Sequence, residues 1–169
     1  MKIIGIDPGL SGAIAILENS KVLNIFDIPV MSEGKKNKRQ LNSALLVSLL
    51  KENITTNDEV AVVVEQVNAM PGQGVTSMFN FGQTFGAIKG ICAALDLPIF
   101  FVRPSKWKKH FELINSSKDS SRTKAIEMYP KLSNQLAKKK DVNKSDAILI
   151  ARFFSETRLT EENKTQISK

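Results

Sequence analysis

The sequence is poor in reactive side chains: it has one cysteine, one histidine and one tryptophan among 169 residues. Because Cys92 has no second cysteine to pair with, an intramolecular disulfide is excluded, and its apolar surroundings in GAIKGICAAL predict a core residue. This fits a reducing compartment, and we expect the protein in the cytoplasm. The single histidine, His110, belongs to no recognisable motif and receives no role.

Long apolar runs are also missing. Asp7 interrupts the first one, and no stretch approaches the roughly 18 apolar residues of a membrane-spanning helix, so neither a signal peptide nor a membrane span is predicted. Internal repeats and low-complexity linkers are absent, and 42% hydrophobic with 24% charged residues argues against disorder. We expect one domain over residues 1–158 and a polar, frayed tail over residues 159–169.

The charge balance is strongly basic, with 24 Lys and Arg residues against 17 Asp and Glu residues and a net charge of +7. Such an excess favours a polyanionic partner such as nucleic acid. The alternative, a basic protein without a nucleic-acid partner, stays open on charge alone.

Hydrophobic patterning predicts strands followed by helices. Three β-branched apolar runs, separated by the turn-like PGLS and ENSK, predict an antiparallel meander over residues 2–7, 12–17 and 22–27. A lysine-rich loop, MSEGKKNK, precedes a predicted helix over residues 39–53. The nearly continuous valines of EVAVVVEQV predict a central strand covered on both faces. The remaining elements are predicted as a helix over residues 74–97, a strand over 98–102 and helices over 120–129 and 144–156.

This order predicts an α/β fold in which right-handed crossovers place the first, fourth and fifth strands side by side and parallel. The first and fourth strands end on carboxylates, Asp7 and Glu65. We expect these carboxylates a few ångströms apart, because neighbouring strands lie roughly 4.8 Å apart. Paired oxygen ligands suit Mg²⁺ or Mn²⁺. Asp7 alone, which precedes Pro8 and Gly9, also fits a simple turn residue.

A third carboxylate, Asp146, precedes Leu149, Ile150 and Phe153 at helical spacing. It therefore lies on the apolar face that packs against the sheet and points towards the strands. Taken alone, Asp146 is also compatible with a residue that complements the dipole at a helix N-terminus. Only the three carboxylates together favour a metal site.

Basic residues follow the fifth strand in RPSKWKKHF, where they flank the aromatic Trp107. Positive charge at the carboxyl end of the sheet suits phosphate contacts beside a metal site. A solvated lysine-rich loop is the alternative, and Trp107 is equally compatible with a core anchor.

In order and spacing, the segments IIGIDPGLSGAIAI, VVVEQV, RPSKWKK and KSDAILIA resemble the RuvC family of Holliday-junction resolvases. The resemblance covers roughly residues 1–155, and MPGQGVTSMFNFG followed by RPSKWK is similar to the branch found in bacteriophages and some bacteria. It implies an RNase H-like fold, with a five-stranded mixed sheet of three antiparallel and two parallel strands flanked by helices. It also implies a homodimer that cuts two symmetrically placed phosphodiesters of a four-way DNA junction with Mg²⁺.

In this family the residues matched by Asp7, Glu65 and Asp146 hold two metal ions, one for the attacking hydroxide and one for the leaving 3′-oxygen. The sequence departs from the pattern at Asn143, where the family usually has Asp or His, and Asp141 replaces that ligand only if the helix starts late. It departs again at Asn68, where bacterial members carry an aromatic wedge. The expected DNA contacts are Arg103, Lys106, Lys108, Lys118, Arg122 and Asn68.

Three glycines recur every four residues in the predicted helix over residues 74–97, at a cost of roughly 1 kcal/mol each relative to alanine. They are Gly82, Gly86 and Gly90. This spacing predicts close backbone approach, either to the sheet beneath or to the same helix of a second subunit.

Other function classes remain to be weighed. A catalytically weak junction-binding protein and an RNase H-like nuclease for another nucleic acid, such as RNA, both fit the motifs. A sugar-kinase or actin-like ATPase also begins with a GIDPG-like strand, but it needs two such domains and 169 residues supply one.

Overall fold

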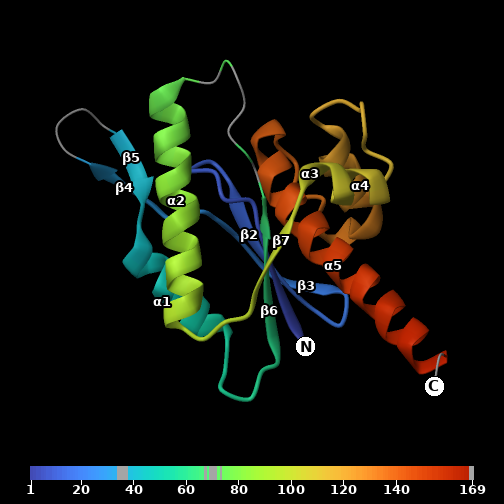
Figure 1. Cartoon of the computed structure of the whole chain (residues 1–169). Coiled ribbons are helices and arrows are strands. Elements are labelled where there is room, and N and C mark those ends of the chain that lie inside the picture. Colours follow the sequence, from blue (N-terminus) through green and yellow to red (C-terminus); the bar gives the residue numbers. More distant parts are fainter. Residues whose placement is uncertain (34–37, 67, 69–71, 73, 168–169) are drawn as a thin grey trace.

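The structure is a computed structural model that describes residues 1–33, 38–66, 68, 72 and 74–167. A five-stranded sheet runs through the molecule between two helical layers (Figure 1). Its strands lie in the order β3-β2-β1-β6-β7 and are β1 (Lys2–Ile6), β2 (Ala13–Glu18), β3 (Lys21–Asp27), β6 (Val60–Glu65) and β7 (Ile99–Val102). β1, β2 and β3 are antiparallel, whereas β1, β6 and β7 are parallel. The predicted mixed sheet is confirmed.

The helices cover both faces of this sheet. α1 (Ser43–Asn53) and α2 (Val75–Ala94) lie on one face, and α3 (Pro104–His110), α4 (Ser120–Met128) and α5 (Val142–Ile167) lie on the other (Figure 1). Short 3₁₀ turns, η2 (Pro130–Leu132) and η3 (Lys139–Asp141), connect α4 to α5. Among the described residues, no helix is both long and apolar enough to cross a bilayer.

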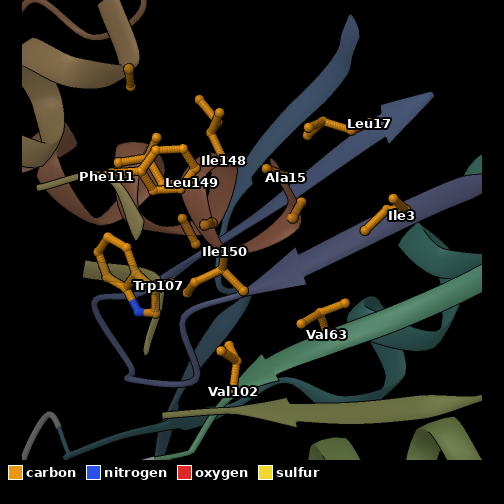
Figure 2. Close-up of a cluster of buried hydrophobic side chains, with 14 of the residues drawn as sticks. Ile3, Ala15, Leu17, Val63, Val102, Trp107, Phe111, Ile148, Leu149 and Ile150 are labelled. Carbon is orange, nitrogen blue, oxygen red and sulfur yellow. The ribbon is translucent and has the colours of Figure 1, made fainter. Parts of the chain in front are cut away.

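Successive side chains of the strands point to opposite faces of the sheet and pack in two separate hydrophobic cores. Ile4 of β1 packs with the α1–α2 layer, where Cys92 is buried as predicted. Ile3 of β1 points to the opposite face and packs with α5, in the cluster shown in Figure 2. Because both faces are covered, the inner strands β2, β1 and β6 are apolar apart from one charged residue at an end of each, and their register is firmly defined.

Gly5 lets α5 approach β1 closely. A Cβ atom at Gly5 would lie 2.2 Å from the carbonyl oxygen of Ala147 and 2.8 Å from the Cβ of Ala151. Both neighbours belong to α5, the helix that also carries Asp146, and both are fully buried. The absence of a side chain at Gly5 therefore sets the distance between β1 and α5.

Gly5→Ala is expected to destabilise the protein by about 1–3 kcal/mol, because the added methyl group overpacks a rigid backbone contact. Thermal unfolding monitored by circular dichroism measures this as a lower Tm. Gly74→Ala is the matched control: only the Ser77 Oγ atom lies within 4 Å of its added Cβ, at 3.9 Å, and its φ of −62° suits alanine, so Tm should change little. Equal Tm values for the two variants would contradict the close-packing role of Gly5.

The segment before α1 differs from the prediction. The helix expected from residue 39 begins only at Ser43, where the Asn42 side chain accepts a hydrogen bond from the Leu45 backbone N–H at 3.0 Å. Residues Lys38–Leu41 form β5, which pairs with β4 (Val30–Glu33) in a small separate sheet. The predicted MSEGKKNK loop is therefore partly strand, and its residues 34–37 lie outside the described part of the chain.

The last helix is also longer than expected. α5 runs without interruption from Val142 to Ile167, so the tail over residues 159–169, predicted to fray, is helical up to residue 167. The division at residue 158 stays a prediction.

Candidate active site

Asp7 and Glu65 leave neighbouring strands at the same end of the sheet. Ile6 of β1 pairs with Val64 of β6 in parallel register, so the next residue on each strand is one of the two carboxylates. Both residues are half-buried, and burial together with the negative charge of Glu65 raises the pKa of Asp7. The structure therefore brings these two predicted residues together.

Asp146 joins them from α5. It lies one turn inside the helix, directly before the fully buried run from Ala147 to Ala151 that packs on the sheet. Its Oδ1 atom is buried and has no hydrogen-bond partner among the described residues. The charge of Asp146 raises the pKa of both Asp7 and Glu65. Since Asp146 lies beyond the first turn of α5, a purely helix-dipole role does not explain its burial.

The three carboxyl groups resist being charged at the same time. Burial, followed by the charges of Glu65 and Asp146, raises the pKa of Asp7 to about 7. Burial also raises the pKa of Glu65 and of Asp146, although the positive charge of Lys108 lowers both. A bound cation would relieve this repulsion and stabilise the ionised carboxylates.

The donor chemistry fits a hard divalent cation, because carboxylate oxygens are the ligands that Mg²⁺ prefers. The unpartnered Oδ1 of Asp146 also fits, since a buried carboxylate oxygen without a partner is costly. Within residues 1–33, 38–66, 68, 72 and 74–167, however, no three Asp, Glu, His or Cys side chains are already arranged to hold a metal ion. The carboxylates interact electrostatically but do not form a finished ligand set.

Trp107 contacts this cluster from α3. This helix lies in the segment for which the sequence offered a solvated lysine-rich loop as one interpretation. The residue is fully buried, so the core-anchor alternative is the correct one. Figure 2 shows its ring at the edge of the α5 core, with the indole nitrogen pointing away from Phe111. That nitrogen donates a hydrogen bond to Oε1 of Glu65 at 2.9 Å. Sequence reasoning missed this contact, although a single tryptophan after the fifth strand was a usable signal.

Trp107→Phe is expected to weaken Mg²⁺ binding about 10-fold, because partners that orient a metal ligand typically contribute this much to affinity. The phenyl ring keeps most of the apolar packing but has no N–H group for Glu65. Isothermal titration of Mg²⁺ into the DNA-free protein measures the effect. Phe111→Leu, which alters the same core without touching a carboxylate, should lower Tm and leave Mg²⁺ affinity unchanged. Equal Mg²⁺ affinities in both variants would contradict a positioning role.

Lys108 is the cation that faces the carboxylates. Its charge lowers the pKa of Asp7, Glu65 and Asp146, and its Nζ lies 5.3 Å from the centre of the Trp107 ring. Lys106 and Arg103, two other predicted DNA contacts, are exposed on or beside α3. Of the three, Lys108 has the strongest structural connection to the site.

A polar cavity of about 360 Å³ lies beside Asp146, between the α3–α4 connection and α5. Lys108, Lys118 and Asn143 line it together with the hydroxyl-bearing Ser117 and Ser121. Lysines and hydroxyl groups are common phosphate ligands. The structure therefore places the predicted Lys118 on the same cavity as Asp146.

The two candidates for a further metal ligand are placed differently. Asn143 donates from Nδ2 to the Ser11 carbonyl oxygen at 2.5 Å and lines the cavity beside Asp146. Asp141 is buried, and its Oδ2 accepts a hydrogen bond from the Lys138 backbone N–H at 2.9 Å while Oδ1 pairs with Lys144 at 3.2 Å. Since α5 starts at Val142, directly after Asp141, the late start that Asp141 would need is not observed.

Arg122 and Asn68 complete the set of predicted residues. The Arg122 guanidinium binds both carboxylate oxygens of Asp119, at 2.7 and 2.6 Å, and the Leu136 carbonyl oxygen at 3.1 Å. These contacts give Arg122 a structural role within the α4 region. Asn68 is exposed, but residues 67, 69–71 and 73 around it lie outside the described part of the chain, as does most of MPGQG.

The glycine ridge of α2, defined as Gly82, Gly86 and Gly90, does not pack on the sheet. Nothing lies within 4 Å of a Cβ atom added at any of the three. The expectation of close approach to the sheet beneath is therefore wrong. Phe79 and Val75 on the same helix are 65% and 85% exposed, so the helix presents an apolar outer surface.

No family model matches the chain, and no curated protein sequence matches it. Solved structures do. Thermus thermophilus RuvC in complex with a Holliday junction substrate is 17% identical, with a TM-score of 0.61 over 93% of this chain and 96% of that one. A second Thermus thermophilus RuvC structure is 18% identical, with a TM-score of 0.53 over the same shares. The fowlpox virus Holliday junction resolvase is 18% identical, with a TM-score of 0.54 over 93% of this chain and 99% of that one. The chain therefore has the RNase H-like fold of the RuvC-type resolvases.

Proposed function

We propose that the protein is a structure-selective endodeoxyribonuclease that resolves four-way DNA junctions by metal-dependent phosphodiester hydrolysis. The observation that carries the proposal is the meeting of Asp7, Glu65 and Asp146 at the carboxyl end of the parallel strands, with Lys108 facing them. The RuvC-like fold adds support, because one structure with this fold holds a Holliday junction substrate. The basic charge of +7 suits a DNA partner.

Asp7, Glu65 and Asp146 would hold Mg²⁺, with Mn²⁺ as an alternative. Bound at these carboxylates, such ions lower the pKa of water and stabilise charge on the attacking and leaving oxygens. Trp107 fixes one oxygen of Glu65 and leaves the other available as a ligand. Lys108 and Lys118 would bind phosphates beside the carboxylates, in the cavity that both line. The expected cytoplasmic location accords with this role.

A four-way junction has near two-fold symmetry, so paired cuts require two active sites related by a matching axis. A closed homodimer supplies this arrangement. We place its interface on the outer face of α2, because the glycine ridge is open and lies beside exposed apolar residues. Small residues at such a ridge permit close helix approach.

A catalytically weak junction-binding protein is the second candidate. Asn143 favours it, because an amide oxygen brings no negative charge to a metal site and the carboxylates do not form a finished ligand set. The first candidate gains support from the three half-buried carboxylates, which a protein that only binds DNA does not need. Buried carboxylates beside a DNA backbone weaken binding unless a cation neutralises them.

The deciding experiment incubates purified protein with end-labelled four-way junctions, linear duplex and RNA/DNA hybrid, with and without Mg²⁺. We expect paired, symmetric nicks in the junction only and only with Mg²⁺. Tight junction binding without nicks would favour the catalytically weak junction-binding protein. Cleavage confined to the hybrid would replace the proposal with a nuclease of another specificity.

Asn143→Asp is expected to raise Mg²⁺ affinity several-fold and shift the Mg²⁺ dependence of cleavage to lower concentration. The same change replaces the amide that donates to Ser11 with a carboxylate facing a carbonyl oxygen, so it should lower Tm without metal. Mg²⁺ should then restore Tm more in the variant than in the wild type. Differential scanning fluorimetry with and without Mg²⁺ measures both effects. If Mg²⁺ raises both Tm values equally, Asn143 does not face the metal.

A further inference from the structure

A second polar cavity lies away from the carboxylates, between the β4–β5 hairpin and α2. It measures about 330 Å³, and its polar lining includes Arg39, Gln40, Asn80 and Gln83, which together define the amide cleft. Among the residues that the structure describes, no carboxylate lines it. One guanidinium and three amide groups therefore line the same cavity.

These side chains do not stabilise the fold through polar contacts with other described residues. Arg39, Gln40 and Gln83 are exposed, and within the described part of the chain none of them forms a hydrogen bond or ion pair through its side chain. The neighbouring Lys38 of β5 is also exposed. Unpaired arginine and amide groups are well suited to nucleic acid, because arginine binds phosphates while Asn and Gln bind base edges, sugars or phosphates.

The amide cleft lies at the same end of the sheet as the carboxylates. Leu10 lines the cleft and is only three residues from Asp7, in the turn between β1 and β2. In Figure 1 the hairpin lies beside α2, on the side away from α3 and α5. DNA bound at the carboxylates and continuing over this turn would enter the cleft.

We propose that the amide cleft binds a DNA strand that continues from the cleavage site, with Arg39 on a phosphate and the amides of Gln40, Asn80 and Gln83 on the nucleotides beside it. This inference rests on the proposed function, because it assigns part of the same DNA to a second surface. A small anionic ligand would be served by the guanidinium alone. The three amide groups that line the same cavity favour an extended polymer.

The test measures DNA binding by fluorescence anisotropy across a range of KCl concentrations, with labelled four-way junction and labelled duplex of the same arm length. Arg39→Ala should weaken binding several-fold and flatten the log–log salt dependence by about 0.9 for the lost phosphate contact. Gln83→Ala should weaken binding without changing the slope, because an amide contact releases no counterion. Lys51→Ala and Gln135→Ala, exposed residues outside the cleft, are the matched controls and should leave both quantities unchanged.

A photo-crosslinking amino acid at Gln40 of the full chain locates the occupant. Crosslinks to DNA, with Arg39→Ala changing the slope, support the proposal. Crosslinks between two copies of the chain, with an unchanged slope, would overturn it and make the cleft a subunit contact. An unchanged slope without any crosslink would also overturn it. If the wild type binds neither junction nor duplex, the proposed function fails as well, whereas wild-type binding that is insensitive to Arg39 removes only the cleft.

Discussion

Asp146→Asn is expected to reduce junction cleavage at least about 100-fold while leaving junction binding intact or tighter. Metal ligands supply several kcal/mol of transition-state stabilisation, and each 1.36 kcal/mol is a factor of ten in rate. The amide keeps the size of the side chain but removes the charge that balances a divalent cation. Binding should not suffer, because one negative charge near the DNA backbone disappears. Asp7→Asn and Glu65→Gln should behave in the same way.

The measurement pairs single-turnover cleavage of a labelled junction with anisotropy binding under identical salt conditions. Asp141→Asn is the matched control. This aspartate is buried near the same helix end, but its carboxylate accepts a hydrogen bond from the Lys138 backbone N–H and pairs with the Lys144 ammonium group. It should lower Tm and leave the cleavage rate of the folded protein close to that of the wild type. Substantial cleavage by Asp7→Asn, or an equal loss in Asp141→Asn, would refute the assignment of the three carboxylates.

Asp7→Asn should also raise the thermal stability of the metal-free protein, because the ionised Asp7 carboxylate is unfavourable in the folded state. The pKa of Asp7 is raised to about 7 in the folded protein, from 3.8, chiefly by burial. A raised carboxyl pKa means that the ionised group costs folding stability, and this cost grows as pH rises from about 4 to 7. Without divalent metal, the variant should therefore have a higher Tm than the wild type at pH 8 and a smaller advantage at pH 5. Mg²⁺ should narrow the gap at pH 8, because it neutralises Asp7 only in the wild type.

The strand-end carboxylates were predictable because their placement follows from general rules. The antiparallel meander makes β3 run parallel to β1, and the helical crossover that follows makes β6 parallel to both, so Asp7 and Glu65 share one end of the sheet. Asp146 followed from helical periodicity, since its spacing to Leu149 and Ile150 puts it on the buried face. These inferences use backbone geometry only and need no knowledge of side-chain contacts.

The support around these carboxylates was harder to predict. α3 has only seven residues and is rich in lysine, so its periodicity is too short to separate a helix from a basic loop. The hydrogen bond from Trp107 to Glu65 joins residues 42 positions apart, and no local pattern encodes such a contact. β4 and β5 pair only with each other, and most of β5 is exposed, so hydrophobic alternation is weak there. The α3 helix, the hydrogen bond from Trp107 to Glu65 and the β4–β5 pair all depend on tertiary contacts rather than on local sequence patterns.

The packing of the glycine ridge could not be predicted from the sequence for a different reason. Spacing every four residues predicted a close approach, but α2 carries apolar residues around much of its circumference, so the sequence did not indicate which side faces the sheet. The structure answers this by burying Thr84, Ile88 and Cys92 and leaving the glycines open. A helix that tolerates three glycines without an internal packing reason accepts a lower intrinsic stability. In the proposed dimer, packing against a second subunit would compensate for this lower stability.

Gly86→Leu is therefore expected to weaken the dimer strongly. Nothing within the chain lies within 4 Å of the new Cβ, so the monomer should fold normally and gain helix propensity of up to about 1 kcal/mol. At a close helix–helix contact, the same side chain would separate the two backbones and lose the packing around them. A partly monomeric protein should cut the two strands of a junction independently and leave singly nicked molecules.

Light scattering coupled to size exclusion measures the dimer at micromolar concentration, and a plasmid with an extruded cruciform reports the cutting pattern. Paired cuts within one binding event linearise the plasmid, whereas uncoupled cuts accumulate nicked circles. Glu52→Leu, which adds a comparable apolar side chain to the exposed surface of α1, is the control and should preserve both the dimer and the linear product. A monomeric wild type without DNA, together with unchanged linearisation by Gly86→Leu, would remove α2 from the interface.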